Sequence, residues 1–72
     1  MISREELKQL RKQYPSGTLI RLIHMDDIQA PPDGTLGRVD HVDDTGTIFV
    51  NWANGSGLGL IIGEDQFEIA NR

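Results

Sequence analysis

The chain has no cysteine and no long apolar run. Without cysteine it can form neither a disulfide nor the thiolate ligands of a structural zinc site, and we expect a cytoplasmic, reducing setting. No stretch supplies the roughly 20 consecutive apolar residues that cross a bilayer, and the opening MISREELKQL is too charged for the apolar part of an export signal. These absences argue against a disulfide scaffold and a membrane partner.

Aromatic residues and positive charges are also scarce. Only four aromatic side chains occur in 72 residues, fewer than a groove for proline-rich signalling peptides requires. Residues 1–25 carry five Lys and Arg against two Glu, whereas residues 26–72 carry two Arg against nine carboxylates. An acidic body repels phosphate backbones, which argues against general nucleic-acid binding outside the N-terminal segment.

The N-terminal residues predict a short helix. Ser3 and Glu6 have the spacing of a capping box, in which each side chain accepts a hydrogen bond from the backbone N–H of the other residue. Pro15 disfavours the helical conformation for the residue before it, so the helix should cover residues 4–13. We assign residues 1–14 to this N-terminal helix.

The remaining residues, 15–72, have the short alternating pattern of β-strands separated by turn residues. Five short antiparallel strands with one apolar face close most economically into a small barrel, so the predicted fold class is mainly β, with five strands and a short N-terminal α-helix. The predicted strands cover about 18–24, 35–42, 47–52, 56–61 and 66–70. The predicted core consists of Ile20, Leu22, Leu36, Val39, Val42, Ile48, Val50, Trp52, Leu58, Leu60, Phe67 and Ile69.

Side-chain parity predicts the register of two hairpins. Each has a three-residue loop, 53–55 or 44–46, that ends in a glycine able to adopt the left-handed conformation. A bulge between Val39 and Val42 is needed to turn both side chains inward. The resulting pairs are Trp52 with Ser56, Val50 with Leu58, Ile48 with Leu60, Val42 with Ile48, and Asp43 with Thr47.

Two resemblances accompany this pattern. The stretch at residues 37–55 is GRVDHVDDTGTIFVNWANG, which resembles the G-x-V … x-V-x-W-x-N-G signature of small SH3-like barrels such as the Mind-bomb/HERC-type domain. Over residues 14–69 the chain is similar to an uncharacterised bacterial domain family of phage and mobile-element type. Its motifs are YP-x-G, HMDD, APP-x-GT-x-G, HVDD, GTI, NW-x-NG, LGLI and GED-x-F.

The second resemblance implies an SH3-like barrel and assigns neither an activity nor a catalytic residue. The chain departs from that family's pattern at Ile62, where proline is expected before Gly63, and at Ala53, where aspartate is common. The first departure weakens the prediction of a turn at Gly63. The second removes a polar contact without affecting the fold.

The tetrapeptides HMDD at 24–27 and HVDD at 41–44 contain the residue types of a metal site or an acid–base pair. The predicted strand pair separates their histidines by about 17 Å, too far for both to bind one ion. We interpret both copies as strand ends that run into turns, in which Asp side chains accept backbone N–H bonds. The alternative is a loose acidic cation site. We predict no metal site and no cofactor.

No catalytic arrangement stands out in the sequence. The three serines occupy cap or turn positions, and the glycines do not form the G-x-x-x-x-G-K-[ST] loop that binds phosphates. Glu64 and Asp65 would need a substrate pocket that a filled small core does not leave. We therefore predict a non-enzymatic protein-interaction module whose partner is another protein or a second copy of the chain.

A basic or cationic partner fits the acidic loops best. Phe49 either covers the bare backbone of Gly57 and Gly59, or lies under the helix with Tyr14, or forms an exposed anchor. Trp52 is either a core residue or a residue at the barrel mouth. The predicted partner-binding residues are Asp26, Asp27, Asp33, Asp43, Asp44, Phe49 and Trp52.

The helix also carries a basic stripe formed by Arg4, Lys8, Arg11 and Lys12. These side chains are either solvated or paired with the acidic body, or they contact nucleic acid. The last option makes an accessory nucleic-acid-binding protein the alternative function, with steep salt dependence as its signature.

Overall fold

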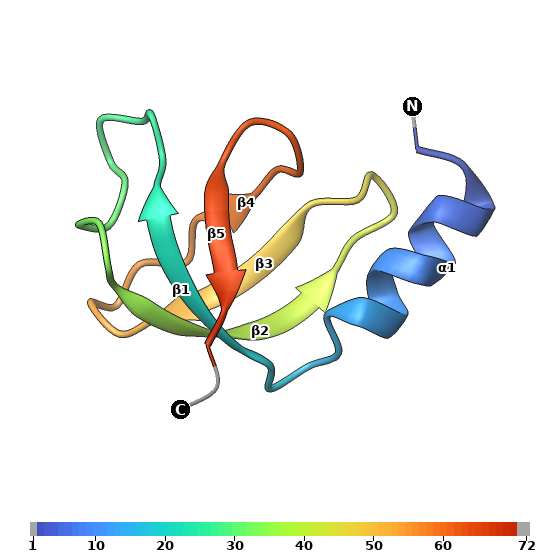
Figure 1. The fold of residues 1–72 in the computed structure, drawn as a ribbon, viewed down its shortest axis with the longest axis horizontal. Coiled ribbons are helices and arrows are strands. Elements are labelled where there is room, and N and C mark those ends of the chain that lie inside the picture. The colour runs from blue at the N-terminus through green and yellow to red at the C-terminus, as the bar shows by residue number, and fades with distance from the viewer. Residues whose placement is uncertain (1, 71–72) are drawn as a thin grey trace.

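The computed structural model describes residues 2–70. One α-helix precedes five β-strands, which confirms the predicted mainly β fold class with a short N-terminal helix (Figure 1). No helix in this range is long and apolar enough to cross a membrane. The elements are α1 (Arg4–Gln13), β1 (Leu19–His24), β2 (Leu36–Val42), β3 (Ile48–Trp52), β4 (Gly59–Leu60) and β5 (Gln66–Ile69).

Helix α1 has the bounds that the sequence predicts. The Ser3 hydroxyl accepts the Glu6 backbone N–H, and the Glu6 carboxylate accepts the Ser3 backbone N–H, both at 3.1 Å. At the other end the backbone N–H of Tyr14 donates to the Leu10 carbonyl at 2.9 Å, and Pro15 prevents a further turn. The capping box and the proline therefore fix both ends of α1.

The strands form one antiparallel sheet in the order β4-β3-β2-β1-β5. The first four strands follow one another as a meander, and β5 returns to pair with β1. Strands β4 and β5 are the two edges, and no hydrogen-bonded ladder joins them within residues 2–70. The sheet is thus open in its hydrogen bonding, whereas the sequence predicts a closed barrel.

Strand β4 is shorter than predicted, two residues instead of the stretch 56–61. The backbone before it is held by side chains instead: the Ser56 N–H donates to Asn54, the Leu58 N–H donates to the Ser56 hydroxyl, and the Leu58 carbonyl accepts the indole N–H of Trp52 at 2.9 Å. Local side-chain bonds have replaced ladder bonds there.

The predicted registers are confirmed where the ladder exists. Ile48 pairs with both Val42 and Leu60, and the ladder between β2 and β3 shifts between Val39 and His41, where a bulge was predicted. The turns after β2 and β3 also close as predicted, each on a left-handed glycine, with φ of 89° at Gly46 and 91° at Gly55. Backbone hydrogen bonds of 3.0 Å also join the predicted pairs Trp52 with Ser56 and Asp43 with Thr47. The predicted pair of Val50 and Leu58 lies outside the ladder.

The core lies on one face of the sheet and extends to the helix. Eight of the predicted core residues are buried: Ile20, Leu22, Val39, Val42, Ile48, Val50, Trp52 and Leu60. Leu58 and Phe67 are half-buried against this cluster. The buried hydrophobic residues outside the predicted strand core are Leu10, Met25 and Ala70. Burial of Leu10 agrees with the apolar stripe that the sequence places on the helix at Leu7, Leu10 and Tyr14.

Two core predictions are wrong. Leu36 is 38% exposed because its neighbour Gly37 takes the inward position, where a Cβ atom would lie 2.6 Å from Val50 and 2.7 Å from Trp52. Large side chains from β3 fill the space that a residue at position 37 would need. Ile69 is 43% exposed because β5 is an edge strand with no neighbour on its outer side.

Candidate functional site

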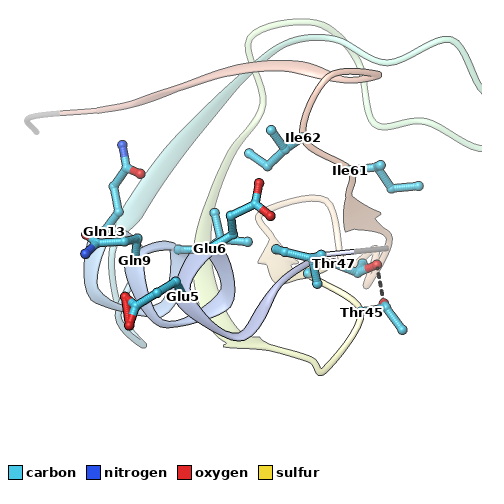
Figure 2. Close-up of a pocket in the computed structure, with 11 residues that line it drawn as sticks. Glu5, Glu6, Gln9, Gln13, Thr45, Thr47, Ile61 and Ile62 are labelled. Carbon is cyan, nitrogen blue, oxygen red and sulfur yellow. Dashed lines mark hydrogen bonds between the residues drawn. The ribbon is translucent and has the colours of Figure 1, made fainter.

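A groove of about 500 Å³ lies between α1, the turn after β2 and the segment after β4 (Figure 2). Its walls come from parts of the chain that are distant in sequence, so only the folded chain forms it. The lining residues are Ile2, Glu5, Glu6, Gln9, Leu10, Gln13, Thr45, Gly46, Thr47, Ile61 and Ile62.

Close packing at the β2–β3 turn holds the helix that forms one wall. Leu10 is the buried residue of α1. A Cβ atom at Gly46 would lie 2.9 Å from Ile2 Cδ1 and 3.7 Å from Leu10 Cδ2, so glycine allows the helix to approach the turn closely. The guanidinium of Arg11 adds two hydrogen bonds to the Val42 carbonyl, at 3.2 and 3.1 Å.

The groove has one apolar side and one polar side. Ile61 and Ile62 are adjacent in the chain and are 45% and 51% exposed, so they form an apolar patch on the groove. The facing helix presents carboxylates and amides at Glu5, Glu6 and Gln9. Figure 2 shows the Glu6 side chain extending from α1 towards Ile62. The lining therefore combines aliphatic surface with negative charge.

The Glu6 carboxylate is held in its charged form. The hydrogen bond from the Ser3 backbone N–H, followed by the bond with the Ser3 side chain, lowers its pKa from the ordinary value of 4.5. Hydrogen bonding to the ionised form favours that form. At neutral pH the groove consequently carries a fixed negative charge beside Ile62.

The first predicted acidic loop, residues 25–34, organises itself internally. Asp27 accepts the backbone N–H of Gln29 at 2.8 Å, and His24 Nδ1 lies 3.2 Å from Asp33 Oδ1. For Asp26, no side-chain hydrogen bond is found within the described part of the chain. The turn interpretation of HMDD is confirmed for Asp27.

The second predicted acidic corner organises a tight turn. Asp43 Oδ1 accepts hydrogen bonds from the Thr45 hydroxyl, the Thr45 N–H and the Thr47 N–H. These bonds, above all the one from the Thr45 hydroxyl, lower the pKa of Asp43 from its ordinary value of 3.8. Asp44 pairs with Arg11 at 2.9 Å. The turn interpretation of HVDD is therefore confirmed, and Asp44 is partly neutralised by the helix.

The basic stripe of the helix is divided. Arg11 is paired with the acidic body, as one of the alternatives predicted. Arg4, Lys8 and Lys12 are exposed, and no ion pair is found for them within residues 2–70. None of the four cations lines the groove.

Phe49 is half-buried on the sheet face opposite the core. It pairs with Gly59, and its ring carbon Cδ1 lies 3.5 Å from the point where a Gly59 Cβ would be, so the ring covers the bare backbone there as predicted. Gly57 has no such cover. The other face of the ring stacks on His41, with centroids 4.9 Å apart. Tyr14 packs on Phe67 instead of Phe49.

Trp52 is a core residue. Only 3% of it is exposed, and its indole N–H donates to the Leu58 carbonyl. The predicted core position is therefore confirmed, and the alternative position at the mouth of a barrel is wrong, because the ring fills the inward space over Gly37. A partner could not contact Trp52 without rearrangement of the core.

The model of a family described as Domain of unknown function (DUF4314) matches residues 3–70. The chain belongs to the DUF4314 family. No curated protein and no solved structure matches it. The match confirms the predicted membership of an uncharacterised domain family.

The groove of this DUF4314 chain was not predicted from its sequence. One signal was available: two adjacent isoleucines cannot both face the core of an alternating strand, so at least one of Ile61 and Ile62 must be exposed. The turn that follows is well formed although Ile62 replaces the expected proline. Ile61 N–H donates to Asp65, and Gly63 adopts a φ of 91°.

Metal-ligating side chains are dispersed in this DUF4314 chain. Within residues 2–70, no group of three or more His, Asp or Glu side chains lies close enough to hold an ion. His24 has its own carboxylate neighbour in Asp33, and His41 has Asp40. The two tetrapeptides therefore take part in separate local structures.

Proposed function

We propose that this DUF4314 chain is a non-enzymatic protein-interaction module whose groove receives a segment of another protein. The observation that carries the proposal is the exposed pair Ile61 and Ile62 beside the groove wall of α1. Exposed aliphatic side chains grouped around a hollow are typical of binding surfaces. The surrounding sheet provides a rigid support for them.

The proposal includes an SH3-like barrel as the scaffold. The strand order supports it: four strands form a meander, and β5 comes back to β1, so that a strongly twisted sheet can curl until its two edges approach. In this arrangement the groove lies outside the sheet, beside the turn after β2. It does not coincide with the Trp52 surface predicted from the resemblance.

Protein is a better partner than nucleic acid for this groove. Its lining contains two carboxylates and no cation. Of the basic stripe, Arg11 is already bound to the Val42 carbonyl and to Asp44. Only three helix cations remain for a phosphate backbone, and they lie beside an acidic body.

The test compares capture from a lysate of the source cells by matched variants. We expect Ile62→Glu to abolish the capture of a specific protein, because a charge in the groove opposes apolar docking. Ile28→Glu is the control, since Ile28 is fully exposed on the β1–β2 loop, which Figure 1 places at the end of the sheet away from α1. Circular dichroism checks that both variants fold.

Two results would contradict the proposal. One is equal capture of every protein by the wild type and by Ile62→Glu. The other is nuclease-sensitive capture, together with NMR shifts on duplex DNA that are confined to Arg4, Lys8 and Lys12. That second result would establish the alternative function of nucleic-acid binding through the helix.

A further inference from the structure

The chemistry of the groove indicates which kind of segment it accepts, provided that the proposed function is correct. On one side, Ile61 and Ile62 offer aliphatic surface that is only half covered. Burial of apolar area at about 25 cal/mol per Å² favours a partner side chain of similar character, such as leucine, isoleucine or valine. The apolar side of the groove therefore favours a segment with an aliphatic side chain as its anchor.

The polar side of the groove sets the charge of the segment. Glu5 and Glu6 belong to the lining, and no Lys, Arg or His does. Arg11, on the same helix, is directed to Val42 and Asp44, and no ion pair is found for Glu5 or Glu6 within residues 2–70. A carboxylate pair beside a low-dielectric wall attracts a positive group.

The amides on α1 add a way to hold an extended backbone. Gln9 and Gln13 also line the groove, one turn apart on the same helix face as Glu5. Each amide can donate to a carbonyl and accept from an N–H group. They can therefore bind peptide groups of any sequence, and the selectivity rests with the isoleucines and the carboxylates.

We infer that the occupant of the groove is a segment of a partner protein in which an aliphatic anchor lies next to a lysine or arginine. The anchor packs against Ile61 and Ile62, and the cation lies near Glu5 and Glu6. A second copy of this chain fits less well, because each copy has a net charge of −4 and carries Glu64 and Asp65 two and three residues after Ile62. An anionic ligand meets the same repulsion.

The experiment is an NMR titration of the labelled full chain with short synthetic peptides. The first peptide has one leucine flanked by lysines, the second has glutamates in place of the lysines, and the third has serine in place of the leucine. We expect the first peptide to shift the amide signals of Ile2, Ile61 and Ile62, and to bind at least about tenfold more tightly than either of the others. A higher salt concentration should lower the affinity for the first peptide.

Matched variants assign the two halves of the interaction. Glu6→Gln keeps the capping box, since glutamine can accept the same bond, and it removes the charge. Combined with Glu5→Gln, this substitution should lower the affinity for the lysine peptide about fivefold. Ile62→Ser should lower the same affinity about tenfold, because it removes apolar surface from the groove. Ile28→Ser on the distant β1–β2 loop is the control, and it should leave the affinity for the lysine peptide unchanged.

Each other result has a definite meaning. Tighter binding of the glutamate peptide, or full affinity of the Glu5→Gln, Glu6→Gln variant for the lysine peptide, would show that the segment need not carry a cation. Either result leaves the proposed function intact. Dimerisation of the wild type, but not of Ile62→Ser, in analytical ultracentrifugation would show that a second copy of the chain occupies the groove. That result overturns the inference. If none of the peptides shifts the groove, the inference is wrong, and the variant-dependent capture described above decides the proposed function independently.

Discussion

The two His-x-Asp-Asp corners differ in what surrounds them. At the end of β1, HMDD opens a long loop in which the fourth residue, Asp27, accepts a backbone N–H two residues ahead. At the end of β2, HVDD opens a tight turn in which the third residue, Asp43, does so, and Asp44 instead binds Arg11 of α1. In both corners the second residue, Met25 or Val42, is buried.

The two corners share the buried second position, whereas their carboxylates have different roles. An aspartate forms an Asx turn only when the chain bends directly after it. The bend comes one residue earlier after β2, because the turn must return at once to pair Ile48 with Val42. Arg11 and the close approach at Gly46 join this second corner to the helix, so perturbing it should affect α1, and perturbing the first corner should not.

The largest expected difference lies between the two closing glycines, Gly34 and Gly46. Both are left-handed, with φ of 90° and 89°, so an alanine at either costs about 1 kcal/mol of stability. At Gly46 the new methyl group would also displace Ile2, whereas at Gly34 it has nothing within 4 Å. We expect Gly46→Ala to cost about 2 kcal/mol and to reduce the helical circular dichroism signal.

Urea unfolding followed by Trp52 fluorescence measures both variants. Adding Ile2→Ala removes the side chain that the methyl group meets, so in that background the cost of Gly46→Ala should fall to that of Gly34→Ala. Equal costs for the two glycine variants in the wild-type background would contradict the close approach of the helix.

The next effect concerns Arg11, which bridges the second corner to α1. Arg11→Ala should cost about 1 kcal/mol, mainly through the hydrogen bonds to the Val42 carbonyl, and should increase exchange of the α1 amides. Asp44→Asn should cost only a few tenths of a kcal/mol, because the Asp44 side chain is 95% exposed. In the first corner Asp27→Ala should leave α1 unchanged. A larger cost for Asp44→Asn than for Arg11→Ala would reverse this ranking.

The smallest effect is the acid sensitivity of the second corner. The pKa of Asp43 is lowered in the folded state, first by the Thr45 hydroxyl, so the folded state binds fewer protons than the unfolded state. Its stabilisation is present above 3.8 and is lost as the pH falls through the lowered folded-state value. Thr45→Val should move this loss to higher pH, and Asp43→Asn should remove it. Urea midpoints measured between neutral and acid pH test both; identical pH profiles for the three chains would contradict the assignment.

The fold was predicted from sequence where the signals were local. The capping box and Pro15 fix α1, and parity together with the glycines fixes the hairpins on both sides of β3. Prediction failed where a neighbour in space decides. Leu36 points outward because Trp52 and Val50 occupy the space over Gly37, and no pattern within β2 contains that information.

The candidate site was predicted less well. The sequence predicted the charge character of the loops and of the helix, and it anticipated that part of the basic stripe pairs with the acidic body, as Arg11 does. It did not place Glu6 and Ile62 at the same groove. These residues are more than fifty positions apart, and the distance between them depends on how the helix docks.

Taken alone, the sequence determined the short-range features of this protein: where the helix starts and stops, which residues turn, and how β2, β3 and β4 align. These follow from backbone hydrogen bonding and side-chain parity over a few residues. Only the tertiary structure decided that the sheet leaves β4 and β5 as unpaired edges and that α1 lies against the turn at Gly46. Both depend on the packing of distant side chains, because burial and close contact are properties of the assembled core.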